Sequence, residues 1–168
     1  MTLTQLFLDE LDREATRTRH AVERVPLGND DWKPHQKSMP LGRLAGLVAS
    51  MPSWVTLIIG QDELNLTPPA GQGQYHQPAT DKLVEALQQN VAKARESLSK
   101  TNDEFLLTTN WKLIAGGRVV ADQPRHIVIR DTLNHLAHHR GQLTVYLRLL
   151  DQPVPAIYGP SADDTTFA

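Results

Sequence analysis

The 168-residue sequence contains no cysteine. Disulfide bonds, thiolate metal ligands and a cysteine nucleophile are therefore excluded, and redox chemistry places no constraint on the compartment in which the protein works. Any thiol chemistry would need a thiol that the substrate brings.

The sequence also lacks a dense block of lysine or arginine, and its formal net charge is −2. We therefore expect no nucleic-acid partner, because nucleic-acid-binding proteins carry a basic patch. No window approaches the roughly 18 consecutive apolar residues of a membrane span. The first residues enter an amphipathic pattern that contains acidic residues, unlike a signal peptide. We expect no membrane association, and a cytoplasmic location.

What is present is an ordinary share of hydrophobic residues, 40% of the chain. This length and composition predict one domain over residues 1–168, with a core of normal size.

The apolar residues recur at steps of three and four in four long segments, which predicts amphipathic helices. Thr2 and Gln5 have capping-box spacing, Ser38 and Thr80 are good N-caps, and Pro52 should kink the second helix. The predicted helices cover roughly residues 3–25, 39–60, a segment after Thr80 that includes residues 84–98, and 124–150.

The segments between these helices have different signatures. Residues 60–80 are rich in glycine and proline and predict a long surface connection. Residues 111–120 alternate around Gly116-Gly117, which predicts a β-hairpin packed against one end of the helices. Residues 151–168 are irregular, but the run from Val154 to Tyr158 is too hydrophobic for a free end. The sequence thus predicts an all-α four-helix bundle with a long crossover loop and a small β-hairpin before the last helix.

The stretch from Asn134 to Leu143 holds three of the seven histidines. His135 and His139 are four residues apart, so on a helix they share one face at about 5–6 Å. Imidazole nitrogen binds Zn²⁺ at about 2.0–2.1 Å and also suits Ni and Fe, so the pair makes half of a divalent-metal site. Leu136 stands where a zincin would carry its general-base glutamate, which excludes that motif.

An alternative interpretation of the pair is a solvated or hydrogen-bonded helix face. Gly141 favours the metal-site interpretation. Glycine in mid-helix costs about 0.5–1 kcal/mol relative to alanine, and the close approach of a backbone or a ligand would explain why it is there.

Several segments together resemble the DinB (damage-inducible) superfamily. These segments are Ser38–Leu44, Met51–Trp54, His135–Leu143 with Tyr146–Arg148, and Val154–Asp163. The resemblance covers nearly the whole chain. It implies a four-helix bundle with unusual connectivity, frequent homodimers, and a divalent metal held by three histidines, two of them matching His135 and His139. It also implies thiol-dependent S-transferase or metal-dependent hydrolase activity, which transfers less well than the fold.

This sequence departs from the family pattern at Leu47, the position that corresponds to the third histidine, on the second helix. An alkyl group cannot ligate a metal, so the predicted site is incomplete. His20, His35 and His76 are candidate substitutes by residue type only.

Two function classes follow. The first is a divalent-metal enzyme for a small-molecule substrate, such as a thiol, in which His135 and His139 hold the ion. The second is a metal-free bundle that binds a small molecule or serves a dimer. No residue can be named as general base.

Three neighbours of the histidine pair receive structural roles. Gln142 is expected to orient a ligand histidine, and His138 to point elsewhere, toward the surface or an interface. Arg140 is expected to pair with a carboxylate such as Asp163 or Asp164 of the tail.

Overall fold

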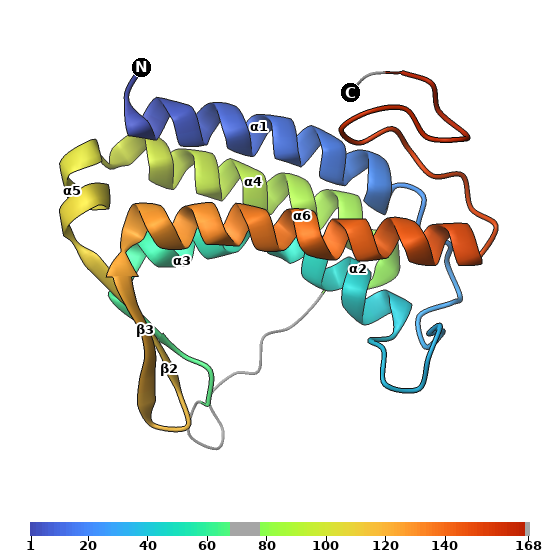
Figure 1. Ribbon diagram of the computed structural model, residues 1–168, viewed down its shortest axis with the longest axis horizontal. Helices are drawn as coiled ribbons and strands as arrows, with labels where there is room; N and C mark the ends of the chain where they lie inside the picture. The colour runs from blue at the N-terminus through green and yellow to red at the C-terminus, as the bar shows by residue number, and fades with distance from the viewer. Residues whose placement is uncertain (68–77, 167–168) are drawn as a thin grey trace.

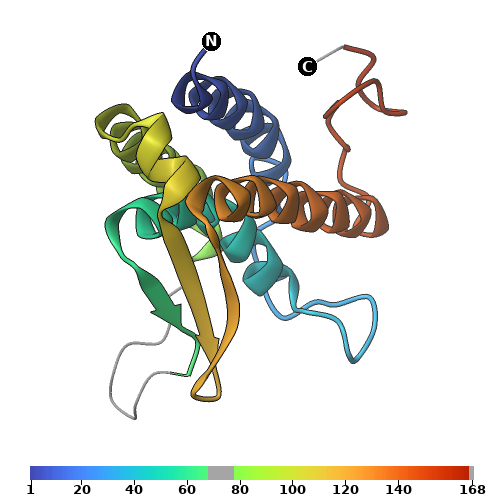
Figure 2. The same ribbon diagram turned by 60° about the vertical axis from the view of Figure 1, so that its left-hand side comes forward.

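A computed structural model describes residues 1–67 and 78–166. The chain is mostly helical, with a small mixed three-stranded sheet at one end (Figure 1). The start of α1 and the tail up to residue 166 lie on the side of the helices opposite the tip of the sheet (Figure 2). The helices are α1 (Leu3–Val22), α2 (Leu41–Ser50), α3 (Pro52–Gly60), α4 (Leu83–Lys100), α5 (Asp103–Thr108) and α6 (Arg125–Leu149), with a 3₁₀ turn at Thr80–Lys82 before α4.

The second predicted helix is two helices. The predicted kink at Pro52 is a break between α2 and α3, which are bent by 49°. Pro52 occupies the first position of α3, where its missing N–H removes no helical hydrogen bond. Ser38 is not the N-cap, since α2 begins at Leu41 with Pro40 before it.

The other predicted helices need smaller corrections. The hydroxyl of Thr2 accepts a hydrogen bond from the Gln5 amide, as capping predicts, and α1 ends at Val22 instead of residue 25. The short helix α5, capped by Asn102, was not predicted.

The predicted hairpin forms from β2 (Asn110–Ala115) and β3 (Arg118–Pro124). Gly116 and Gly117 both have positive φ, at 56° and 73°, which glycine adopts without steric cost. A third strand, β1 (Glu63–Asn65), pairs parallel with β2. It lies inside the connection predicted over residues 60–80, of which residues 68–77 are outside the described part.

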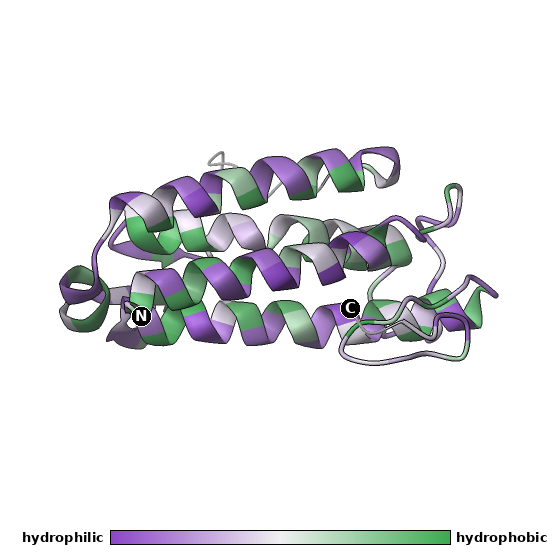
Figure 3. Ribbon diagram, turned by 90° about the horizontal axis from the view of Figure 1, so that it is seen from above, coloured by the Kyte–Doolittle hydropathy of each residue, from purple (hydrophilic) through white to green (hydrophobic). Residues whose placement is uncertain are grey.

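The core has two clusters of buried side chains along the helices. One joins α2 and the second half of α6 through residues such as Val48 and Leu143. The other joins α1, α3, β2 and the first half of α6 through residues such as Phe7 and Trp111, and Trp54 packs against both. Hydrophilic and hydrophobic residues alternate in bands along each long helix, as an amphipathic period requires (Figure 3).

A buried arginine joins the elements at the sheet end of the molecule. Arg125 is 1% exposed and donates to the carbonyl oxygens of Ile58 and Gln61. It also pairs with Asp62 at 2.6 Å and stacks on the Phe105 ring. It therefore fixes the end of α3 and the start of β1 against the start of α6.

The tail folds back on the helices as predicted. Arg148 pairs with Asp163, and Ala156 is 1% exposed. The expected pairing of Arg140 with the tail carboxylates is wrong. Arg140 binds Glu14 of α1 at 2.6 Å, because both side chains point into the helix interface, where each is 1–2% exposed.

Within the described residues, no single helix has the length and apolar composition of a membrane span. The bent α2 and α3 pair meets that test only when the two helices are counted together.

Candidate functional site

The two predicted ligand histidines converge on α6. The Nε2 atoms of His135 and His139 lie 2.8 Å apart, and their ring centroids are 4.6 Å apart. His139 is 9% exposed, while His135 lies at the surface next to the Trp54 ring, 5.6 Å away. The i, i+4 spacing thus brings two imidazole nitrogens to one point, as the sequence predicts.

Gln142 fixes which ring nitrogen of His139 faces His135. Its Oε1 lies 2.7 Å from the Nδ1 of His139, so this nitrogen carries the proton and donates. The Nε2 of Gln142 donates to the Nε2 of His138 at 3.1 Å, which agrees with that orientation of the Gln142 amide. The Nε2 of His139 is then an acceptor that receives a hydrogen bond from His135. A metal ligand needs this same free nitrogen, so the orienting role predicted for Gln142 is geometrically available.

Partial loss of hydration lowers the pKa of His135, and the neighbouring His139 and His138 lower it further. The imidazole of His135 is therefore neutral near pH 7. Neutral imidazole is the form that binds a metal and also the form that makes a direct hydrogen bond with His139.

A third ligand for this pair is absent from residues 1–67 and 78–166, where no group of three or more histidine, aspartate or glutamate side chains is placed to hold a metal. Leu47 is partly buried and packs against the core cluster of α2 and α6. His35 accepts a hydrogen bond from the amide of Lys37 in a loop, His20 lies on α1, and His76 lies outside the described residues. The described donor set therefore fits a weakly held ion with two protein ligands.

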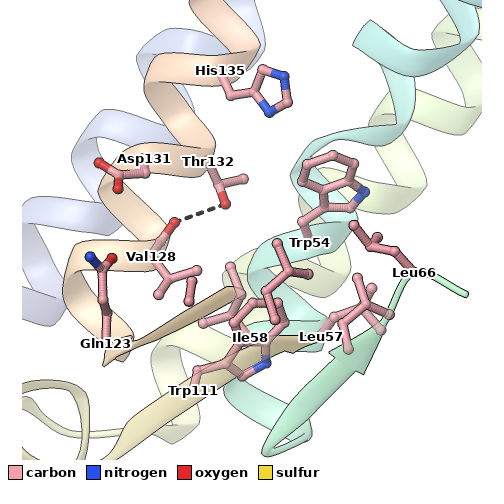
Figure 4. A pocket seen from close by; sticks show the side chains of 13 residues that line it. Trp54, Leu57, Ile58, Leu66, Trp111, Gln123, Val128, Asp131, Thr132 and His135 are labelled. Carbon is pink, nitrogen blue, oxygen red and sulfur yellow. Dashed lines mark hydrogen bonds between the residues drawn. The ribbon is translucent and has the colours of Figure 1, made fainter. Parts of the chain in front are cut away.

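A cavity of about 350 Å³ begins at His135 and runs between α3, α6 and the sheet (Figure 4). Its walls carry mostly apolar side chains: Trp54, Leu57 and Ile58 from α3, Leu64 from β1, Leu66 after it, Trp111 and Leu113 from β2, Ala121 from β3, and Val128 from α6. A volume of this size lies in the range of small-molecule sites.

Apart from the indole N–H of Trp111, which is buried without a hydrogen-bond partner among the described residues, the main polar groups of the cavity come from one side. His135, Thr132, Asp131 and Gln123 belong to α6 and the end of β3, opposite the aromatic ring of Trp54 (Figure 4). The hydroxyl of Thr132 already donates to the Val128 carbonyl at 2.9 Å. His135 is thus both a member of the histidine pair and part of the cavity wall.

The sequence did not predict the position of the cavity. Trp54 lies in a predicted helix and Trp111 in the predicted hairpin, and nothing in their local pattern shows that α3 and β2 meet. The close approach of a backbone expected at Gly141 is not found among the described residues. A Cβ built at Gly141 meets no atom within 4 Å.

Comparison with known proteins supports this architecture. The sequence model of the DinB family matches residues 1–166. A DinB-like protein of Bacillus cereus ATCC 10987 is similar in structure with a TM-score of 0.68 at 22% identity, over 90% of this chain and 95% of that one. A DinB-like protein of Bacillus subtilis gives 0.66 at 16% identity, over 87% and 92%. No match was found among curated proteins.

Proposed function

Because this chain belongs to the DinB family, we propose that it is a divalent-metal-dependent enzyme, of the thiol-dependent S-transferase or the hydrolase type, that acts on a small molecule in the cavity beside His135. The observation that carries this proposal is the convergence of the two Nε2 atoms of His135 and His139 at 2.8 Å, with Gln142 orienting the second ring. The proposed bundle has four members: α1, the bent pair of α2 and α3, α4, and α6.

His135 and His139 would hold the ion, which could be Zn, Ni or Fe. When bound, a divalent ion lowers the pKa of a coordinated water or thiol toward neutrality. The protein residues have separate tasks. Gln142 holds the His139 proton at Nδ1, and Trp54 and Trp111 line the apolar space next to His135. A substrate bound in the cavity would present its polar end to the imidazole of His135.

Metal titration by calorimetry tests the proposal. Two neutral imidazoles should bind Zn²⁺ or Ni²⁺ weakly, and occupancy should fall as the pH drops through the range where the histidines protonate. Leu47→His should tighten binding at least tenfold, about 1.4 kcal/mol, if α2 faces α6 at that level. His139→Ala should abolish binding. His35→Ala, in an exposed loop, is the control and should leave binding unchanged.

The outcomes separate the alternatives. If the wild type binds as tightly as Leu47→His, another residue supplies the third ligand. If His139→Ala binds as well as the wild type, the site is not at these histidines and the proposal fails.

A second candidate is a metal-free protein whose cavity binds a small molecule. It is favoured by the absence of a third ligand among the described residues and by the direct hydrogen bond between the two histidines. The same titration distinguishes it, because this candidate predicts no specific heat of metal binding. A homodimer remains the expectation from the family resemblance, and sedimentation equilibrium would measure it.

A further inference from the structure

We propose that the cavity between α3, α6 and the sheet selects a neutral, largely apolar molecule about the size of a two-ring aromatic, and rejects anions. The inference rests on the proposed function only in treating this cavity as the substrate site. It adds the chemical class of the molecule that the site takes.

Size sets the first limit. An apolar cavity of about 150 Å³ in another protein holds benzene, and this cavity is about 350 Å³. Two fused rings, or a branched chain of similar volume, would fill it. The rings of Trp54 and Trp111 in its wall offer faces and edges for aromatic stacking.

Charge sets the second limit. No lysine or arginine belongs to the lining, and the lining carries one carboxylate, Asp131. Arg130 lies 3.5 Å from Asp131 but points to solvent with an exposed side chain. In the metal-free protein, an anionic group entering the cavity would lose its hydration without gaining a cationic partner, which disfavours carboxylates and phosphates.

The hydrogen-bonding groups define how the molecule would lie. Apart from the indole N–H of Trp111, they are on α6 and at the end of β3, with His135 at one end of the cavity (Figure 4). An apolar body against Trp54 and Ile58 would leave a hydroxyl or similar neutral group near His135. Anionic thiols of low molecular weight do not meet this description, so a thiol co-substrate would have to bind outside the cavity.

A matched ligand pair tests the inference on the full-length chain at pH 7. 2-Naphthol is neutral and 2-naphthoate is anionic, and both carry the same ring system. Calorimetry should show 2-naphthol binding, with 2-naphthoate at least tenfold weaker. If 2-naphthoate bound as tightly as 2-naphthol, or if neither bound, the inference would be overturned.

Two variants on β3 test whether 2-naphthol binds in this cavity. Ala121→Phe fills the cavity and should weaken 2-naphthol binding at least tenfold, whereas Val120→Phe, at a position that is 58% exposed and outside the lining, should leave it unchanged. If Ala121→Phe folds and binds as well as the wild type, the site is wrong.

The wild type alone provides a second readout. The indole N–H resonances of Trp54 and Trp111 should shift when 2-naphthol binds, while that of Trp32, which packs on Tyr146 instead, should not. A shift of Trp32 alone would contradict the inference. All measurements are made with and without a chelator. If the protein binds 2-naphthol but no metal, this inference stands and the proposed metal role fails. If it binds a metal but not 2-naphthol, the proposed metal role stands and this inference fails.

Discussion

At the scale of single residues, the most consequential feature is the buried charge network between α1, α6 and the tail. Arg140 pairs with Glu14, donates to the Thr18 hydroxyl at 3.1 Å and to the Tyr158 hydroxyl at 2.7 Å. Tyr158 in turn donates to Glu14 at 3.0 Å. Arg17 also pairs with Glu14 at 2.6 Å. Removing Glu14 would therefore leave Arg140 without a carboxylate, whereas removing Arg140 would leave Glu14 with one cationic partner instead of two.

Arg140→Ala should lower the free energy of unfolding by about 3 kcal/mol, the lower end of the range for breaking a buried pair, because Glu14 keeps Arg17 as a partner. The control is Arg95→Ala, which removes a surface ion pair with Asp12 and should cost less than about 1 kcal/mol. Urea denaturation of both variants measures the difference. Equal losses in the two variants would mean that the buried network contributes no more than a surface pair.

The same network predicts a pH dependence. Burial would raise the pKa of Glu14, but the charge of Arg140 and hydrogen bonds from Arg17, Arg140 and Tyr158 outweigh it and hold that pKa below its ordinary value. Its stabilising contribution is then complete above the ordinary carboxyl pKa of about 4.3 and is lost as the pH falls through the lowered value.

Glu14→Gln should consequently be less stable than the wild type by a constant amount from pH 8 to about pH 5, with the gap closing at lower pH. Denaturant midpoints measured across this range test the prediction. A gap that widens on acidification would reverse the sign and contradict it.

At the scale of elements, two glycines should respond in opposite directions to the same change. Gly117 has φ +73° in the hairpin turn, where a Cβ is strained, so Gly117→Ala should destabilise by about 1–2 kcal/mol. Gly141 lies in mid-helix with open space around its Cβ position, so Gly141→Ala should stabilise by about 0.5–1 kcal/mol.

Thermal unfolding of the two variants under identical conditions provides the comparison. If Gly141→Ala destabilised the protein, something outside the described chain, such as a second copy, would have to approach that face of α6. A stabilised Gly117→Ala would mean that the turn is not the one described.

At the scale of the whole molecule, the tail acts as the outer layer of the buried network. Arg17 donates to the Ile157 carbonyl at 3.1 Å, and Tyr158 closes over the ion pair of Arg140. Deleting residues 154–168 should lower the melting temperature by roughly 5–10 °C, since a few kcal/mol shifts a chain of this length by that amount.

Tyr158→Phe keeps the ring and removes only the hydroxyl, so it should account for a minor part of that loss, about 1 kcal/mol. An unchanged melting temperature after the deletion would show that the tail contributes nothing to stability.

Local patterns in the sequence were sufficient for what neighbouring residues decide. The three-to-four-residue period predicted the long helices, Gly116 and Gly117 predicted the hairpin turn, and the spacing of His135 and His139 predicted their convergence. Pro52 predicted a kink but not a complete break. These features depend on backbone geometry over a few residues, which the residue types themselves set.

Tertiary structure decided what depends on distant partners. Strand β1 has three residues, too few for a pattern, and exists because β2 accepts it as a parallel neighbour. Glu14 and Arg140 are 126 positions apart, so their pairing follows from how α1 packs on α6. The cavity likewise draws its walls from α3, α6 and all three strands, and its apolar character beside the histidine pair arises only when these elements pack together.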